Sequence, residues 1–251
     1  MSAPFAVFGP GVVIVTRTDT ATPVAVNVGY ANEFSLDVSG SAKGLFGQKQ
    51  FALAVARGTI KVTGKIKAAT LSGLAWNCTF FGQSFAAGGD SYYMDEAHTV
   101  ATTTQIVTNV TGGIVDLGVK YASSGLPLQR VAAGAEATGK YSVNQTTGTY
   151  TFAVGDEVAL LFSYSNAQTA TGQQLQVTNQ MLGTNPTFQL DYYTSLNQPT
   201  AKPFGARLFN CVADKVSLAT KLEDFMMPEI DFQVFANNSG SVMNFDFPEV
   251  S

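Results

Sequence analysis

The chain has 251 residues and a net charge of −4, with 45% hydrophobic and only 13% charged residues. This length suits one large domain, or one domain with an insertion, that buries a substantial core. The acidic balance argues against a protein that binds nucleic acid by neutralising its phosphates, and Cys78 and Cys211 lack the spacing of a metal site. We interpret the two cysteines as small buried apolar residues, with a disulfide left open.

Short alternating runs predict strands in the first sixty residues. They cover residues 12–15, 34–38 and 51–55, and a Gly-rich patch separates the last two. The N-terminus lacks both a basic start and an apolar run long enough for a signal peptide or a membrane span. We therefore expect a protein that stays in the cytoplasm where it is made until it is assembled, with no membrane partner.

The clearest pattern lies between Arg57 and Gly82, where a strand runs into a helix. Apolar residues and glycine alternate with polar ones over 60–67, so that one strand face is apolar and the other basic. A helical spacing of apolar residues follows and predicts a helix over about 68–81 that ends at Gly82. The residues expected inside the subunit are Ile60, Val62, Ile66, Leu71, Leu74 and Cys78.

The middle of the chain changes composition. Residues 83–100 are Gly-rich and predict a loop, whereas 99–165 are rich in Thr, Val, Gly and Tyr, with regular turn signals. Within this stretch, 141–154 predicts a hairpin with Gly148 in its turn, and 160–164 predicts a further strand. We interpret 99–165 as a small β unit inserted into one domain formed by 1–98 and 166–251.

The last third returns to strands. Alternating runs cover 188–190, 208–212 and 230–234. Residues 216–226 also fit a helix, but strand or turn is favoured there.

Motifs with catalytic associations lack the context that their chemistry needs. The sequence Asp-Glu-Ala-His at 95–98 matches a helicase motif, which needs a phosphate-binding loop upstream of it. The stretch 134–140 resembles such a loop, but it lies downstream, and Tyr141 follows it in place of the Ser or Thr that would bind magnesium. His98 is the only histidine, and the sequence contains no Gly-x-Ser-x-Gly motif with a nucleophilic serine that it could activate. We therefore favour the interpretation that His98 is a solvated loop residue. Glu229 and Asp231 lie on the polar face of an alternating strand. We expect no enzymatic activity, no catalytic residue, no metal and no cofactor.

Three segments resemble the tail tube (major tail) proteins of long-tailed bacteriophages. They are residues 43–82, 139–165 and 208–242, which together make up somewhat under half of the chain and follow the expected order. Each segment matches in its pattern of apolar, glycine and acidic positions, and none carries a catalytic signature.

The resemblance implies a mostly β fold: a β-sandwich with one flanking α-helix and the small inserted β unit. Copies of such a subunit would close into a hexameric ring through an inner β-barrel, and rings would stack into the tube that serves as the conduit for genome delivery. The subunit would be assembled in the host cytoplasm into the virion tail. Its partners would be its own copies and the tape measure, tail terminator and tail tip proteins. DNA would pass without specific binding, because a basic wall would retain its phosphates.

The candidate subunit-interface residues are Phe46, Arg57, Lys61, Lys65, Trp76, Phe80, Glu223 and Asp224. The lysines of the basic strand face allow two interpretations: a solvated edge that discourages unwanted pairing, or an ion-pair seam with the Glu223/Asp224 region of another copy. Trp76 and Phe80 lie four apart on one helix side, and their burial inside the subunit is the competing interpretation.

A second function stays open: a β-sandwich adhesin or glycan-binding module. Its distinguishing feature would be exposed aromatic residues clustered around Tyr92, Tyr93 and Tyr121.

Overall fold

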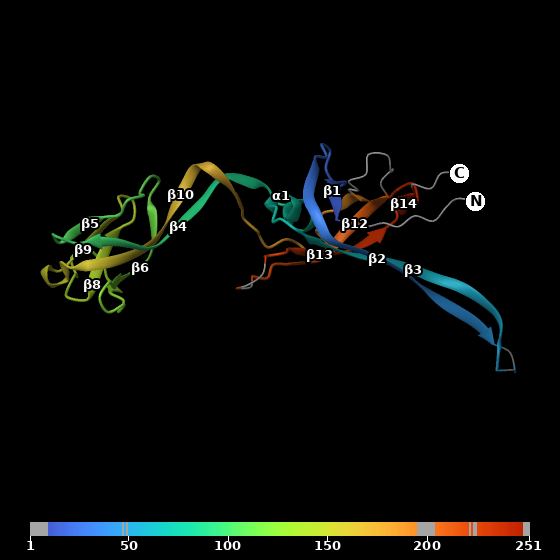
Figure 1. Ribbon diagram of the computed structural model, residues 1–251, viewed down its shortest axis with the longest axis horizontal. Helices are drawn as coiled ribbons and strands as arrows, with labels where there is room; N and C mark the ends of the chain where they lie inside the picture. Colours follow the sequence, from blue (N-terminus) through green and yellow to red (C-terminus); the bar gives the residue numbers. More distant parts are fainter. Residues whose placement is uncertain are drawn as a thin grey trace. The chain divides into compact units, whose positions relative to one another are not determined.

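The computed structural model describes residues 10–46, 48, 50–194, 204–220, 222 and 225–247. The chain divides into two units: unit 1 is Met1–Gln83 together with Val177–Ser251, and unit 2 is Ser84–Gln176. Strands dominate both units, and the described residues contain one short α-helix, in agreement with the mostly β sandwich fold predicted from the sequence (Figure 1).

Unit 1 is built on one sheet that closes on itself. Its elements are β1 (Gly11–Arg17), β2 (Ala25–Phe46), β3 (Ala52–Ala68), α1 (Gly73–Trp76), the π-helix η1 (Asn77–Phe81), β11 (Phe188–Thr194), β12 (Gly205–Ser217), β13 (Glu229–Phe235) and β14 (Met243–Asp246). Among the described residues the strand order is β11-β1-β2-β3-β13-β12-β14, and β11 also pairs with β12. Every neighbouring pair in this sheet is antiparallel.

The core of unit 1 follows from the two-residue period of its strands, because alternate side chains point to the same face. Val62, Ile66 and Cys78 are buried, as predicted. Gly64 lies in register with Phe232 on β13, whose ring occupies the space that a side chain at position 64 would need. The other large buried side chains of this core are Val13, Val15, Phe188, Leu190, Leu208 and Ile230.

The helix is shorter than the predicted 68–81. Ala68 ends β3, and the side chain of Ser72 caps the helix by accepting a hydrogen bond from the Ala75 backbone nitrogen at 3.2 Å. The last turn is a π-turn, closed by a 2.8 Å hydrogen bond from the Gly82 nitrogen to the Asn77 oxygen. Gly82 ends it with a φ of 63°, so the predicted helix end is confirmed.

Three residues predicted to lie in the core are exposed. Leu71 precedes the helix instead of lying on its buried face, and Leu74 lies on its outer side. Ile60 lies on β3 beyond the last residue pair with β13, Val62–Val234. The alternating pattern at 60–66 placed Ile60 on the correct face of its strand, but none of the residues that the structure describes covers that face there.

Unit 2 is a small sandwich. Its elements are β4 (Phe85–Thr99), β5 (Thr104–Ile106), β6 (Ile114–Tyr121), β7 (Gln129–Arg130), β8 (Lys140–Asn144), β9 (Thr149–Phe152), the 3-10 helix η2 (Val154–Asp156) and β10 (Ala159–Leu175). Among the described residues the sheet β4-β10-β6 faces the sheet β5-β9-β8-β7 across a separate apolar core. This core contains Leu160, Phe162, Tyr164, Tyr141, Tyr150 and Phe152.

The structure corrects one local prediction in unit 2 and confirms another. Residues 83–100 are not a loop, because Phe85–Thr99 forms β4 and pairs along β10. Unit 2 therefore extends beyond the predicted 99–165 at both ends. The hairpin at 141–154 is confirmed: β8 pairs with β9, and Gly148 has a φ of 64° in the turn between them.

Candidate assembly surface

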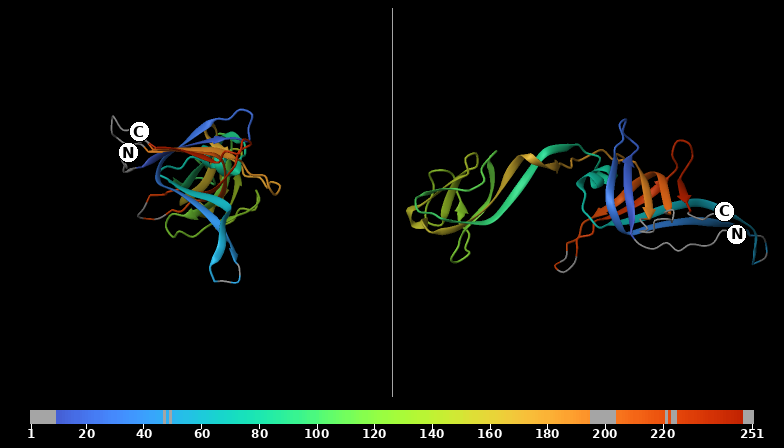
Figure 2. Two further views of the ribbon diagram at one scale, coloured as in Figure 1. Left: turned by 90° about the vertical axis from the view of Figure 1, so that its right-hand side faces the viewer. Right: turned by 45° about the horizontal axis from the view of Figure 1, so that its top comes forward.

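The hairpin formed by β2 and β3 extends beyond the closed sheet. β3 pairs with β13 only from Lys67 to Val62, whereas it pairs with β2 as far as Ala52. At about 3.3 Å per residue, the ten residues of β3 before Val62 carry this two-stranded ribbon about 30 Å past the sheet. Figure 2 shows it projecting from the other strands of unit 1.

The hairpin exposes its large apolar side chains. Each of them is more than half exposed: Val38, Leu45, Phe46, Phe51, Leu53, Val55 and Ile60. A two-stranded ribbon is at best marginally stable in water by itself, and soluble monomers rarely expose contiguous apolar patches above a few hundred Å². The ribbon therefore has the character of a surface that another protein covers.

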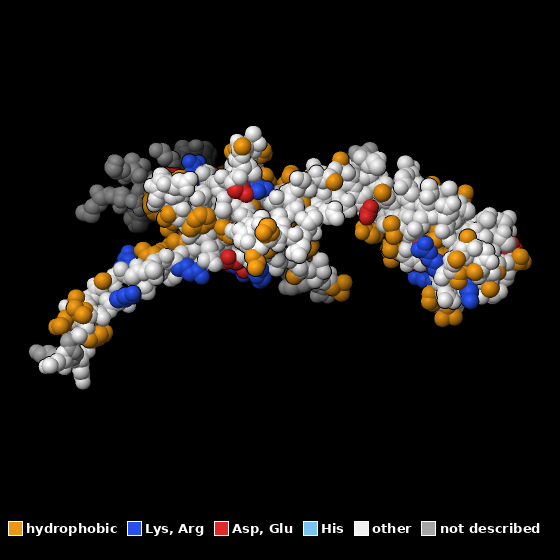
Figure 3. Space-filling model, turned by 180° about the vertical axis from the view of Figure 1, so that it is seen from behind, with side chains coloured by type: hydrophobic (Ala, Val, Ile, Leu, Met, Phe, Trp, Pro, Cys, Tyr) orange, Lys and Arg blue, Asp and Glu red, His pale blue; other side chains and the backbone are white. Residues whose placement is uncertain are grey.

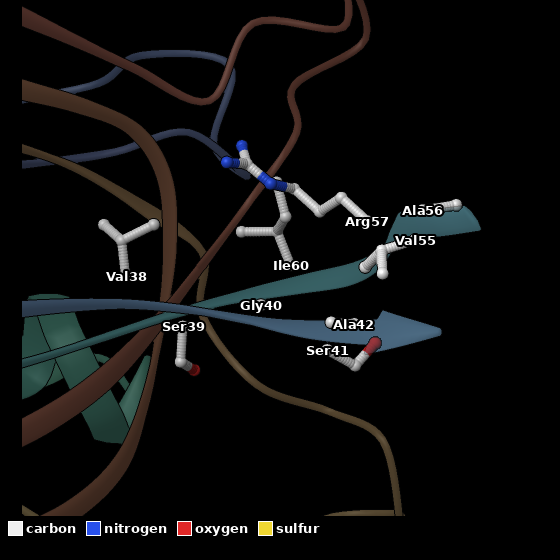
Figure 4. Close-up of a pocket in the computed structure, with 9 residues that line it drawn as sticks. All are labelled: Val38, Ser39, Gly40, Ser41, Ala42, Val55, Ala56, Arg57 and Ile60. Atoms are coloured by element: carbon white, nitrogen blue, oxygen red, sulfur yellow. The ribbon is translucent and has the colours of Figure 1, made fainter. Parts of the chain in front are cut away.

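The base of the hairpin has an apolar side and a polar side. Val38 and Ile60 lie on one side of the ribbon, and Ser39 and Ser41 lie on the other (Figure 4). Gly40 has no side chain to fill the apolar side, where the stem of Arg57 lies next to Ile60. The result is an open pocket of about 400 Å³ lined by these residues.

Charge on the hairpin is of one sign. The stretch 38–62 contains Lys43, Lys49, Arg57 and Lys61 and no acidic residue, although the chain as a whole is acidic. Figure 3 shows blue and orange side chains along this arm, at the lower left. Within the described residues, neither Lys43 nor Arg57 nor Lys61 forms an ion pair. A partner surface with acidic groups would complement them.

Lys65 and Lys67 are not part of a solvated edge, because β3 has β2 on one side and β13 on the other. The Nζ of Lys65 lies 2.5 Å from Oε1 of Glu229, and Lys67 pairs with Glu33. The hydrogen bond between Lys65 and Glu229 raises the pKa of Lys65 and lowers that of Glu229. These lysines thus have acidic partners inside the same subunit, which removes Lys65 as a free contact for a neighbour.

Trp76 and Phe80 have different environments. Trp76 is partly buried and packs against the core of unit 1, which favours the intrasubunit interpretation. Phe80 is 36% exposed and meets Phe81 edge to face at a centroid distance of 5.2 Å. Glu223 and Asp224 lie outside the described residues.

Unit 1 also exposes apolar side chains at its opposite end. Residues 177–187 lead into β11, and 218–228 connect β12 to β13, at the end of β3 marked by Ala68. Met181, Leu182 and Leu222 are each more than four-fifths exposed there. Of the stretch 216–226, for which the sequence favours strand or turn over helix, residues 221, 223 and 224 lie outside the described residues, and the described ones contain no helix.

In unit 2, the Asp-Glu-Ala-His stretch belongs to β4 and is structural. Glu96 accepts hydrogen bonds from Tyr164, His98 and both the nitrogen and the hydroxyl of Thr108, the last two at 3.0 and 2.6 Å. Burial alone would raise the pKa of Glu96, but these hydrogen bonds outweigh it and hold the pKa at about 2. His98 packs edge to face on Phe162, so it is not the solvated loop residue that was predicted.

A buried carboxylate, that of Asp116, ties the two sheets of unit 2 together. Asp116 on β6 accepts hydrogen bonds from Tyr141 on β8 at 2.8 Å and from Tyr150 on β9 at 3.0 Å. Its side chain is 3% exposed, and Arg130 lies 3.7 Å away. Burial and the neighbouring carboxylate raise the pKa of both tyrosines. Both hydroxyls therefore stay protonated as donors, which suits a structural role.

Unit 2 lacks the aromatic cluster that an adhesin was expected to display at this position. Tyr92 is exposed, but Tyr93 stacks on the buried Tyr164 at 5.0 Å. Tyr121 donates its hydroxyl hydrogen to the buried Asp156. These two tyrosines thus face the interior of unit 2 and do not join Tyr92 on its surface.

No protein-family model matches this sequence, and no curated protein matches it either. In the part of the chain that the structure describes, no group of three His, Cys, Asp or Glu residues could hold a metal ion. No helix among the described residues is long and apolar enough to cross a membrane.

Sequence reasoning identified Phe46, Arg57 and Phe80 as exposed residues but missed most of the surface around them. The sequence places Leu45 in the Gly-rich patch between two strands, and it places Phe51, Leu53 and Val55 in an alternating strand. A signal was present, because 38–62 contains cations and no acids next to these apolar residues. That pattern is more typical of a ribbon that is exposed on both faces than of a strand inside a sheet.

Proposed function

We propose that this protein is a structural subunit that assembles with its own copies into stacked rings, as the tail tube of a bacteriophage virion. The β2–β3 hairpin carries the proposal. It projects about 30 Å from the sheet, exposes its large apolar residues and bears cations that lack acidic partners among the described residues. Contact with another copy would remove this surface from water.

The two ends of unit 1 support head-to-tail association. The hairpin leaves the sheet at one end, and the exposed residues Met181, Leu182 and Leu222 lie at the other. Surfaces that differ at the two ends of a subunit form heterologous contacts, which close into rings or continue as open stacks. The resemblance to tail tube proteins supports six copies in each ring, a lumen through which DNA passes, and tape measure, terminator and tip proteins as further partners.

The experiment is to concentrate the purified protein and examine it by negative-stain electron microscopy and sedimentation. We expect rings or tubes for the natural sequence. Phe46→Asp places a charge in the apolar part of the hairpin and should raise the concentration needed for half-maximal assembly at least tenfold. Val154→Asp, at an exposed position of unit 2, is the matched control and should leave assembly unchanged. A natural sequence that stays monomeric at every salt concentration would contradict the proposal.

A further inference from the structure

A groove lies along one side of unit 1, away from the hairpin. It is bounded by η1, by residues 177–185 and by the second half of β12, and its volume is about 750 Å³. This falls within the range of roughly 300–1,000 Å³ that is typical of binding pockets. Its lining includes Phe80, Val177, Thr184, Val212 and Asp214. We call this feature the Phe80 groove.

The Phe80 groove has a mixed lining with one acidic residue. Its apolar members are Phe80, Phe81, Val177, Val212 and Ala213, and the remaining described lining residues are uncharged polar ones together with Asp214. Phe80 and Val177 both expose more than a third of their surface at its rim. Asp214 is the charged residue of the described lining, and its Oδ2 accepts a 2.7 Å hydrogen bond from the Gln233 side chain. Among the described residues no cation pairs with Asp214. The groove therefore offers apolar contact and negative charge at the same place.

These properties complement those of the hairpin. The hairpin combines exposed Phe46 and Leu45 with Lys43 and Arg57, which form no ion pair within the described residues. Apolar surface on both sides provides the attraction, and opposite charge sets the orientation and favours the correct partner. The hairpin lies at the Ala52 end of β3, whereas η1, which bounds the groove, follows the Ala68 end, so the hairpin does not reach the groove of its own subunit.

We infer that the Phe80 groove receives the β2–β3 hairpin of a second copy of this chain. The inference rests on the proposed function and adds the acceptor site to it. Phe46 and its apolar neighbours lie against Phe80 and Val177, and the cations of the hairpin face Asp214. Each subunit thereby offers a hairpin to one neighbour and a groove to another, which gives an open stack of copies.

Crosslinking tests this pairing. The natural Cys78 and Cys211 are buried, and burial raises the pKa of the Cys78 thiol to about 11, so both react slowly at neutral pH. The double variant Phe46→Cys, Val177→Cys should form a ladder of disulfide-linked chains when the assembled protein is oxidised mildly. Phe46→Cys combined with Asn238→Cys, which is exposed in the turn after β13, should not form it.

A charge exchange tests the same pairing without a crosslink. Asp214→Lys should raise the concentration for half-maximal assembly about fivefold, and adding Lys43→Glu in the same chain should restore most of the loss. If the natural protein assembles but neither the ladder nor the charge effect occurs, the groove is not the acceptor and the proposed function stands. If the natural protein never assembles, both the acceptor site and the proposed function are wrong.

Discussion

Glu96 couples the stability of unit 2 to pH. The fold lowers its pKa from 4.5 to about 2, so folding favours the carboxylate. The resulting stabilisation is present in full above pH 4.5 and is lost as the pH falls towards 2. We expect the free energy of unfolding of unit 2 to fall by about 3 kcal/mol over this window through Glu96 alone.

Glu96→Gln should flatten that pH dependence and lower the stability of unit 2 at pH 7, because an amide accepts the same hydrogen bonds less strongly. Hydrogen exchange of peptides from unit 2, followed from pH 5 to pH 2, measures the effect. Glu157→Gln, at an exposed carboxylate of the same unit, serves as the control. An unchanged pH profile in Glu96→Gln would show that other carboxylates govern the acid response.

Asp116 should be the most sensitive single position in unit 2. Asp116→Ala leaves the hydroxyls of Tyr141 and Tyr150 without their acceptor inside the core. We expect a loss of about 3 kcal/mol in the free energy of unfolding of unit 2, measured by calorimetry. Asp90→Ala, at an exposed position of β4, should change it by less than about 0.5 kcal/mol. Equal effects from the two variants would remove the tyrosine–carboxylate cluster as a stabilising feature.

At the scale of elements, β3 depends on close packing at Gly64. A side-chain carbon added there would lie 2.3 Å from the ring of Phe232, which is itself 1% exposed. Gly64→Ala should therefore destabilise unit 1 by about 2 kcal/mol. Fluorescence reports this directly, because Trp76 is the only tryptophan in the chain and packs on the same core.

Gly40→Ala is the matched control for Gly64→Ala. Its added carbon would lie no closer than 3.8 Å to any neighbouring atom. The substitution should leave the unfolding transition of unit 1 where it is in the natural protein. A large effect at Gly40 with none at Gly64 would mean that the β3–β13 register is different in solution.

Alternation in the sequence correctly predicts which side chains of a strand are buried where that strand has a neighbouring strand on each side. Val62 and Ile66 are buried because β2 and β13 flank β3 and a core faces it. The same alternation at 51–60 looks identical in sequence, but it lies beyond β13, and its large apolar side chains are exposed among the described residues of unit 1. Alternation identifies the faces of a strand and carries no information on whether another layer covers them.

The helix and ion-pair predictions were limited because they depend on helix capping and on long-range strand pairing, which the local sequence pattern does not show. Regular helical spacing predicted buried Leu71 and Leu74, but the cap at Ser72 starts the helix after Leu71 and leaves Leu74 in its first turn on the outer side. For Lys65 the sequence leaves open a solvated edge or an ion-pair seam with another copy, because its partner Glu229 lies 164 positions away in the sequence. Only the β3–β13 pairing brings the two together.

At the scale of the molecule, unit 2 should fold independently of unit 1. Its apolar core and the carboxylates that anchor it, Glu96, Asp116 and Asp156, come from residues within Ser84–Gln176. Expressed alone, this segment should unfold in one cooperative transition, measured by calorimetry. A segment that is unfolded alone at neutral pH would mean that unit 2 depends on the remainder of the chain.

Removal of unit 2 should leave the contacts of the hairpin intact. Joining Gln83 to Val177 through a short Gly/Ser linker retains every residue of the β2–β3 hairpin and of the closed sheet. We expect this variant to assemble at a concentration within about threefold of that of the full chain, measured by sedimentation. Loss of assembly would assign unit 2 a direct part in the contacts between copies.

The central claim is that the β2–β3 hairpin joins copies of this chain. Its most direct test is negative-stain microscopy of the concentrated natural protein next to a variant in which residues 41–58 are replaced by a tight turn. Unit 1 should fold in both, because its core residues lie outside this stretch, and Trp76 fluorescence checks this. The natural protein should form stacked rings, and the shortened variant should form none. Equal stacking by both proteins, or stacking by neither, would contradict the account.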